Sequence, residues 1–143
     1  MWKNHFQGIS EECTFSTPTT KNEIDKVESL LNVTLPQELK EIMLETNGVK
    51  GSYELGLIWP LDRIINENKH YRDGFLEEYY MPFENLVFFA ESGIGDLFAF
   101  PVSQNRVCRD DVFVWNHEND SRMWVAPSVT KYVEWWLNGI IKI

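Results

Sequence analysis

One stretch near the middle of the chain constrains the fold more than any other. Residues 85–90 form a short apolar run, residues 96–100 form a second one, and Pro101 ends it. Gly93 and Gly95 lie between the two runs, and glycine adopts bends that residues with a Cβ resist. Short apolar runs separated by a tight turn are typical of strands inside a sheet. We therefore predict a central β-hairpin here, with the rest of the chain packed around it.

Apolar residues at helical spacing predict two helices before this hairpin. A stripe from Ile24 to Leu31 marks the first, and the second opens at Leu35-Pro36 and ends at Asn47-Gly48. Proline suits the first turn of a helix, where its missing N–H costs nothing, and Asn-Gly is a common C-terminal cap. Because only about three residues join the two helices, we expect a helical hairpin.

Beyond residue 51 the pattern changes to short strands, with helices again near the end of the chain. Helices at both ends of consecutive antiparallel strands indicate an α+β fold, a mainly antiparallel sheet packed with helices from both ends. The elements predicted in this part are a strand at 52–59, a short helix at 61–65 before a polar loop at 66–70, strands at 111–116 and 122–126, and a last helix with Ser128 as N-cap and Gly139 at its end.

Length and composition indicate one domain with an aromatic core. The 143 residues fit a single domain, of which residues 1–18 form an N-terminal extension. Six Trp, nine Phe and five Tyr supply enough apolar surface that no metal or disulfide is needed for stability. Cys13 and Cys108 are expected to be reduced, partly buried thiols of a cytoplasmic protein. We expect no secretion signal and no segment that spans a membrane.

The charge of the chain limits its partners. Its net charge is −9, from 22 acidic and 13 basic residues. This argues against direct binding to nucleic acids or anionic membranes, where a basic patch supplies much of the affinity. It fits a basic protein partner, because opposite fields speed encounter. On charge alone, solubility is the simpler explanation.

No catalytic or metal-binding motif is complete. The glycine-rich turn is followed by Asp96 and a strand, not by the Gly-Lys-Ser/Thr and helix of a phosphate cradle. His117-Glu118 begins like a zinc-protease motif, but position 121 is Ser where the second histidine belongs. Nothing in the sequence places Cys108 against His117 as a nucleophile and base. The acidic residues at 110–120 lack the spacing of a calcium loop. We therefore expect neither an enzyme nor a cofactor or metal.

Several landmarks follow one another in a fixed order over residues 20–138. They are the Ile24/Glu28/Leu31 helix, Leu35-Pro36, Thr46-Asn47-Gly48, Ile58-Trp59-Pro60-Leu61, Pro82-Phe83, Gly93-Ile94-Gly95-Asp96, Val112-Phe113-Val114-Trp115, Glu118-Asn119-Asp120 and the Tyr132/Trp136 helix. Their order and spacing resemble the SUKH superfamily, also called the Smi–Knr family. The resemblance implies a SUKH-like α+β fold without a catalytic motif. In bacteria, such proteins are similar to immunity proteins that bind and neutralise toxin domains, some of them nucleases, and eukaryotic relatives resemble regulatory or scaffold proteins.

Our leading hypothesis from the resemblance is therefore stoichiometric binding of a cognate bacterial toxin domain, possibly a nuclease. An acidic face would cover the toxin's active site, since carboxylates can take phosphate positions in a basic groove. The residues expected on this face are Glu91, Asp96, Glu118 and Asp120, with Trp135 as an apolar anchor. The alternative is an intracellular regulatory or scaffold module of the Smi–Knr type without a toxin partner.

Two of these residues have a second interpretation. Asp96 is either an exposed carboxylate aimed at a partner or an acceptor of backbone N–H bonds from its turn, which is the commoner use of Asp. Trp135 points about 100° away from its neighbour Trp136 on a helix. It is therefore either partly exposed, as tryptophans at binding hot spots are, or buried against the sheet edge. Trp59, Trp115 and Trp136 are expected in the core.

Overall fold

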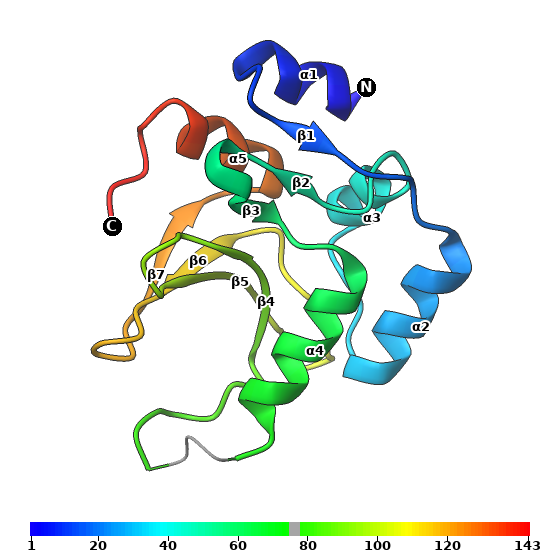
Figure 1. Ribbon diagram of the computed structural model, residues 1–143. Coiled ribbons are helices and arrows are strands. Elements are labelled where there is room, and N and C mark those ends of the chain that lie inside the picture. Colours follow the sequence, from blue (N-terminus) through cyan, green and yellow to red (C-terminus); the bar gives the residue numbers. More distant parts are fainter. Residues whose placement is uncertain (75–77) are drawn as a thin grey trace.

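Two antiparallel sheets lie side by side, and helices pack around them (Figure 1). This computed structural model describes residues 1–74 and 78–143. The α+β fold predicted from the sequence is confirmed. The elements in chain order are α1 (Trp2–Ile9), β1 (Thr14–Phe15), α2 (Lys21–Leu31), α3 (Gln37–Met43), β2 (Val49–Lys50), the 3-10 turn η1 (Ser52–Glu54), β3 (Gly56–Ile58), α4 (Leu61–Arg72), β4 (Leu86–Glu91), β5 (Leu97–Pro101), β6 (Val112–Trp115), β7 (Arg122–Ala126) and α5 (Val129–Leu137).

The larger sheet has the strand order β4-β5-β6-β7, and the smaller has the order β1-β2-β3. The predicted central hairpin is the β4–β5 pair, in register from Leu86 opposite Pro101 to Glu91 opposite Leu97. The two sheets meet where the Trp59 N–H donates to the Phe89 carbonyl at 2.8 Å. The outer side of β4 is therefore contacted by the smaller sheet at Phe89, whereas β7 is the outermost strand at the other side of the larger sheet.

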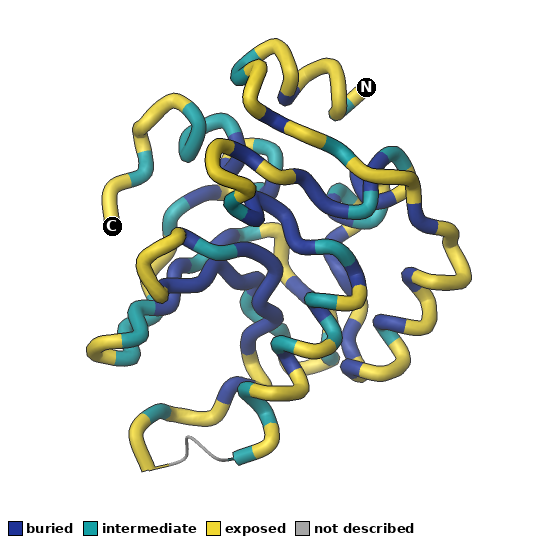
Figure 2. Tube along the Cα trace, viewed as in Figure 1, coloured by how far each residue is buried: buried dark blue, intermediate teal, exposed yellow. Residues whose placement is uncertain are grey.

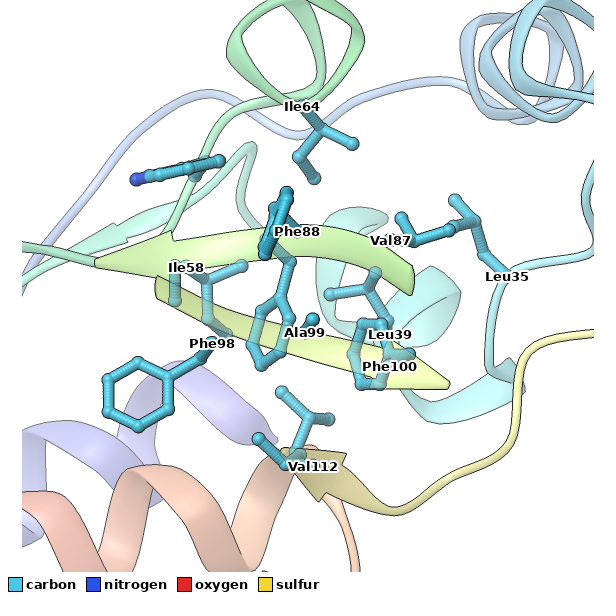
Figure 3. Packing of buried hydrophobic residues seen from close by; sticks show 14 of the residues in the cluster. Leu35, Leu39, Ile58, Ile64, Val87, Phe88, Phe98, Ala99, Phe100 and Val112 are labelled. Atoms are coloured by element: carbon cyan, nitrogen blue, oxygen red, sulfur yellow. The ribbon is translucent and has the colours of Figure 1, made fainter. Parts of the chain in front are cut away.

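Aromatic side chains fill the space on both faces of the larger sheet. On one face, Phe88 and Trp115 pack with Tyr71 of α4. On the other face, Tyr132 of α5 contacts both Phe89 and Phe98. Figure 3 shows Ile64 of α4 on one side of the β4–β5 hairpin and Val112 on the other. β4 and β5 are consequently buried along nearly their whole length, and exposed residues gather on turns and outer helices (Figure 2).

Side-chain hydrogen bonds cap the first turns of two helices, α2 and α5. The Thr20 side chain accepts from the Glu23 N–H, and the Glu23 carboxylate accepts from the Thr20 N–H, which forms a capping box for α2. The predicted N-cap Ser128 accepts from the Lys131 N–H at 3.2 Å and opens α5. These contacts satisfy N–H groups that the first turn of a helix leaves unpaired.

The prediction of a polar loop at 66–70 was wrong, because α4 continues to Arg72. Asn68 explains the difference. Its side chain is 1% exposed, donates to the carbonyls of Ile64 and Phe88 at 2.7 and 2.8 Å, and accepts from the Phe88 N–H at 2.8 Å. The Asn68 side chain therefore joins α4 to β4 by hydrogen bonds, although asparagine is a residue type common in loops.

Other boundaries also differ from the predictions. α3 ends at Met43 rather than near Gly48, and α2 lies beside α4 instead of pairing with α3 in a helical hairpin (Figure 1). Gly48 instead precedes β2 with φ of +98°, at a point where a Cβ would lie 2.9 Å from the Ile58 carbonyl oxygen. The strand predicted at 52–59 is shorter, because Tyr53 and Glu54 take left-handed backbone conformations before β3. The first 18 residues contain α1 and β1.

None of the helices in the described part of the chain combines the length and apolar character needed to cross a membrane.

Candidate protein interface

The five residues predicted on the binding face fall into three places. Asp96, Glu118 and Asp120 lie at the end of the larger sheet where the β4–β5 and β6–β7 turns project, Glu91 faces α4, and Trp135 lies on α5. The structure therefore does not gather them into one acidic surface.

Asp96 is buried, with 5% of its surface exposed. One oxygen, Oδ1, accepts from the His117 backbone N–H at 3.1 Å and lies 2.7 Å from His117 Nδ1. This corrects the interpretation of Asp96 as an exposed carboxylate. The acceptor role is present, but its donors come from the β6–β7 turn and not from the turn that contains Asp96. The residue joins the two turns.

Asp120 holds the β6–β7 turn to the segment at 78–83. It accepts from the Trp115 indole N–H at 2.8 Å, the Met81 N–H at 2.9 Å and the Arg122 guanidinium at 3.0 Å. Burial opposes ionisation of Asp120, but these donors outweigh it and lower the pKa of the carboxyl. The Asp120 carboxylate is therefore occupied by contacts within the protein at this end of the larger sheet.

Glu118 is the one predicted acidic residue that is fully available to a partner. It is exposed at the tip of the β6–β7 turn, and its carboxylate has no hydrogen-bond or ion-pair partner among the described residues. Its backbone N–H is held by the Asn116 side chain at 2.8 Å, so the turn beneath it is fixed.

Glu91 forms a bidentate ion pair with Arg63 of α4. The two oxygens accept from the guanidinium at 2.9 and 3.1 Å, and Oε2 also accepts from the Gly56 N–H at 3.0 Å. Burial raises the pKa of Glu91, but the Arg63 and Gly56 donors outweigh it and lower the pKa overall. Arg63 also stacks on the buried Trp59 ring, 4.5 Å from its centroid. Arg63 and Trp59 line a cleft of about 480 Å³ beside the smaller sheet.

Trp135 is half-buried and packs edge-on against Trp124 of β7, with 6.3 Å between ring centroids. Its neighbour Trp136 contacts Phe98 and is also half-buried, whereas Trp59 and Trp115 are in the core as expected. Trp124 is 50% exposed and was not among the residues predicted on the binding face. Its exposure depends on β7 being the last strand of the sheet, which the strand pattern alone does not reveal.

The two cysteines are free and buried. Burial raises the pKa of Cys108 to about 12, so its nucleophilic thiolate form is strongly disfavoured near neutral pH. In the residues that the structure describes, no group of three or more His, Cys, Asp or Glu side chains could hold a metal ion.

A model of a known protein family matches most of the chain. The model of the SMI1 / KNR4 family (SUKH-1) matches residues 18–135, which extend from the segment before α2 into α5. No curated protein matches the chain.

Proposed function

Because the chain belongs to the SMI1 / KNR4 family (SUKH-1), we propose that it is a bacterial immunity protein. It would bind a cognate toxin domain in the cytoplasm and neutralise it as a stoichiometric complex, without turnover. The match over residues 18–135 is the observation that supports this proposal. An acidic chain suits a toxin with a basic substrate groove, such as a nuclease, because complementary charge speeds association and selects partners.

Within this proposal, the five predicted residues take different roles. Glu118 and Trp135 are proposed to contact the toxin, since both have exposed surface. Glu91, Asp96 and Asp120 support the face from within, because each carboxylate is already bonded to another part of the chain. Replacing any of these three would test the fold as much as the binding.

The first experiment is co-expression with the C-terminal domain of the nearest encoded large secreted protein. Growth rescue together with a stable one-to-one complex in a pull-down would support an immunity function. Full toxicity without a complex, while the protein remains folded, would count against this pairing and in favour of a regulatory or scaffold role.

A charge reversal then tests the contact at Glu118. We expect Glu118→Lys to weaken binding of the toxin domain about 10-fold by slowing association and adding local repulsion. Glu41→Lys makes the same change at an exposed position of α3 and is expected to leave affinity within about 2-fold of the unsubstituted protein. Equal affinities for both variants would remove Glu118 from the proposed interface.

A further inference from the structure

β7 is the open edge of the larger sheet. The sheet ends with β7, and among the described residues no strand pairs with its outer side. The opposite outer strand, β4, is different because the backbone of Trp59 bonds to it. An open edge presents unpaired backbone groups and side chains that a partner can reach.

Large apolar side chains are exposed along this edge. Met123 is 62% exposed, Trp124 is 50% exposed, and Ile140 just after α5 is 58% exposed. Trp135 contacts Trp124, and the Ile140 N–H donates to the Trp135 carbonyl at 2.8 Å. Trp124, Trp135 and Ile140 form what we name the Trp124 surface; Met123, the neighbour of Trp124 in the strand, points to the other face of the sheet. Tryptophan is enriched among the residues that dominate binding energy at protein interfaces.

No charged side chain of β7 points outward to screen its apolar side chains. Proteins often place a Lys or Arg on an edge strand to prevent pairing with other chains. The only charged residue of β7, Arg122, turns inward and donates to the carbonyls of Met81 and Pro82, each at 2.9 Å. Its guanidinium also lies over the Phe83 ring, 4.9 Å from the centroid. β7 is short, and its pairing with β6 has a register shift opposite Val112 and Phe113; both features hinder pairing with a further strand, so a partner would contact the side chains of β7.

Acidic groups lie at both ends of β7. The Trp124 indole N–H points to Asp111 at 3.4 Å, and Asp111 is also paired with Arg109 at 3.1 Å, whereas Asp110 beside it is exposed. Glu118 is exposed on the turn that precedes β7. A nearby cation, Lys131 of α5, is paired with Glu134 at 3.0 Å. The net charge of −9 also opposes docking of a second copy of the chain. The charges therefore favour a basic occupant.

We infer that the Trp124 surface is the docking site for a basic, apolar segment of the partner toxin domain. The apolar side chains of that segment pack on Trp124 and Trp135, and its basic side chains lie near Asp110 and Glu118. This inference rests on the proposed immunity function, and it names the surface that would perform it.

The test is titration calorimetry of the purified protein with the toxin domain identified by co-expression. We expect Trp124→Ala to weaken binding about 30-fold, as truncation of a central tryptophan does at other interfaces. The matched control is Leu30→Ala, on α2 at the opposite side of Figure 1 from β7. Leu30 is 46% exposed, close to the value for Trp124, and its replacement is expected to leave affinity within about 2-fold.

A second pair of variants tests the charge of the partner. Ile140→Lys and Ile140→Glu both remove an exposed apolar side chain of the Trp124 surface, so they differ chiefly in charge. We expect the Lys variant to bind about 10-fold more weakly than the Glu variant, because it repels a basic segment. The reverse order would overturn the assignment of a basic partner.

The outcomes separate the two proposals. If the unsubstituted protein neither binds nor rescues, the immunity function fails and the docking assignment fails with it. If it binds and Trp124→Ala binds equally well, only the docking surface is wrong. If Trp124→Ala instead abolishes self-association in sedimentation and leaves toxin affinity unchanged, the surface belongs to a homodimer and the inference is overturned.

Discussion

Asp96 and His117 join the two turns at the end of the larger sheet through one carboxylate oxygen. Asp96 Oδ1 meets the His117 ring nitrogen Nδ1 at 2.7 Å and its backbone nitrogen at 3.1 Å. The aspartate side chain is only 7% exposed, whereas the imidazole is 38% exposed. The residue that completes the Gly-x-Gly-Asp pattern therefore fixes the position of the neighbouring turn, on which Glu118 lies.

Removing this carboxylate should destabilise the fold. We expect Asp96→Ala to lower the free energy of unfolding by about 2 kcal/mol, because the buried His117 bonds are lost and the partial exposure of the ring limits the cost. Urea denaturation followed by tryptophan fluorescence measures it. Glu118→Ala, which removes an exposed carboxylate nearby, should change stability by less than about 0.5 kcal/mol. An equal effect of both substitutions would contradict the role assigned to Asp96.

Gly95 must lack a side chain for two reasons. Its φ is +102°, and a Cβ would lie 2.6 Å from the His117 ring. We expect Gly95→Ala to cost about 2 kcal/mol or more of unfolding free energy, from the strained conformation together with displacement of the ring. Gly8, in α1, has open space around it, so Gly8→Ala should stabilise by up to about 1 kcal/mol. Thermal unfolding of the two variants should therefore shift in opposite directions, and a Gly95→Ala variant as stable as the original would refute the argument.

Asn68 should be among the most sensitive polar positions. Asn68→Ala removes three hydrogen bonds and leaves the buried N–H and C=O of Phe88 without these partners, so we expect a loss of about 3 kcal/mol. Asn66→Ala on the same helix changes an exposed residue and serves as the matched control. Chemical denaturation should show a large loss only for position 68. A small loss there would mean that α4 is seated by its apolar contacts alone.

The Glu91–Arg63 pair should make stability depend on pH. The pKa of Glu91 is lowered in the folded state, so its contribution is present above the ordinary glutamate pKa of about 4.3 and is lost as pH falls through the folded value. We expect Glu91→Gln to be less stable than the original at pH 7 and the difference to shrink as the pH falls below about 4.

Unfolding free energies measured by urea denaturation across this pH range test the expectation. In an Arg63→Gln background, Glu91→Gln should change the pH dependence less, because the guanidinium that lowers the Glu91 pKa is gone. The same pH dependence with and without Arg63 would show that the ion pair does not contribute.

The features that the sequence determined by itself are those set by neighbouring residues. Gly93 and Gly95 supply the positive φ angles of the central turn, and Ser128 caps the helix that follows it. These signals act within a few residues of the chain, so they can be read without knowing what packs nearby. The antiparallel order of the central strands follows from the same local turns, and the α+β fold follows from their arrangement between helices.

Only the tertiary structure decided which polar and aromatic side chains are buried and which are exposed to a partner. Asn68 extends α4 because it bonds to Phe88, which lies 20 positions away in the chain. Asp96 is buried because the His117 turn folds over it, and Trp124 is exposed because no strand of the described chain follows β7 in the sheet. Burial depends on distant segments that fill or leave open the space around a side chain, and no local pattern of residue types contains that information.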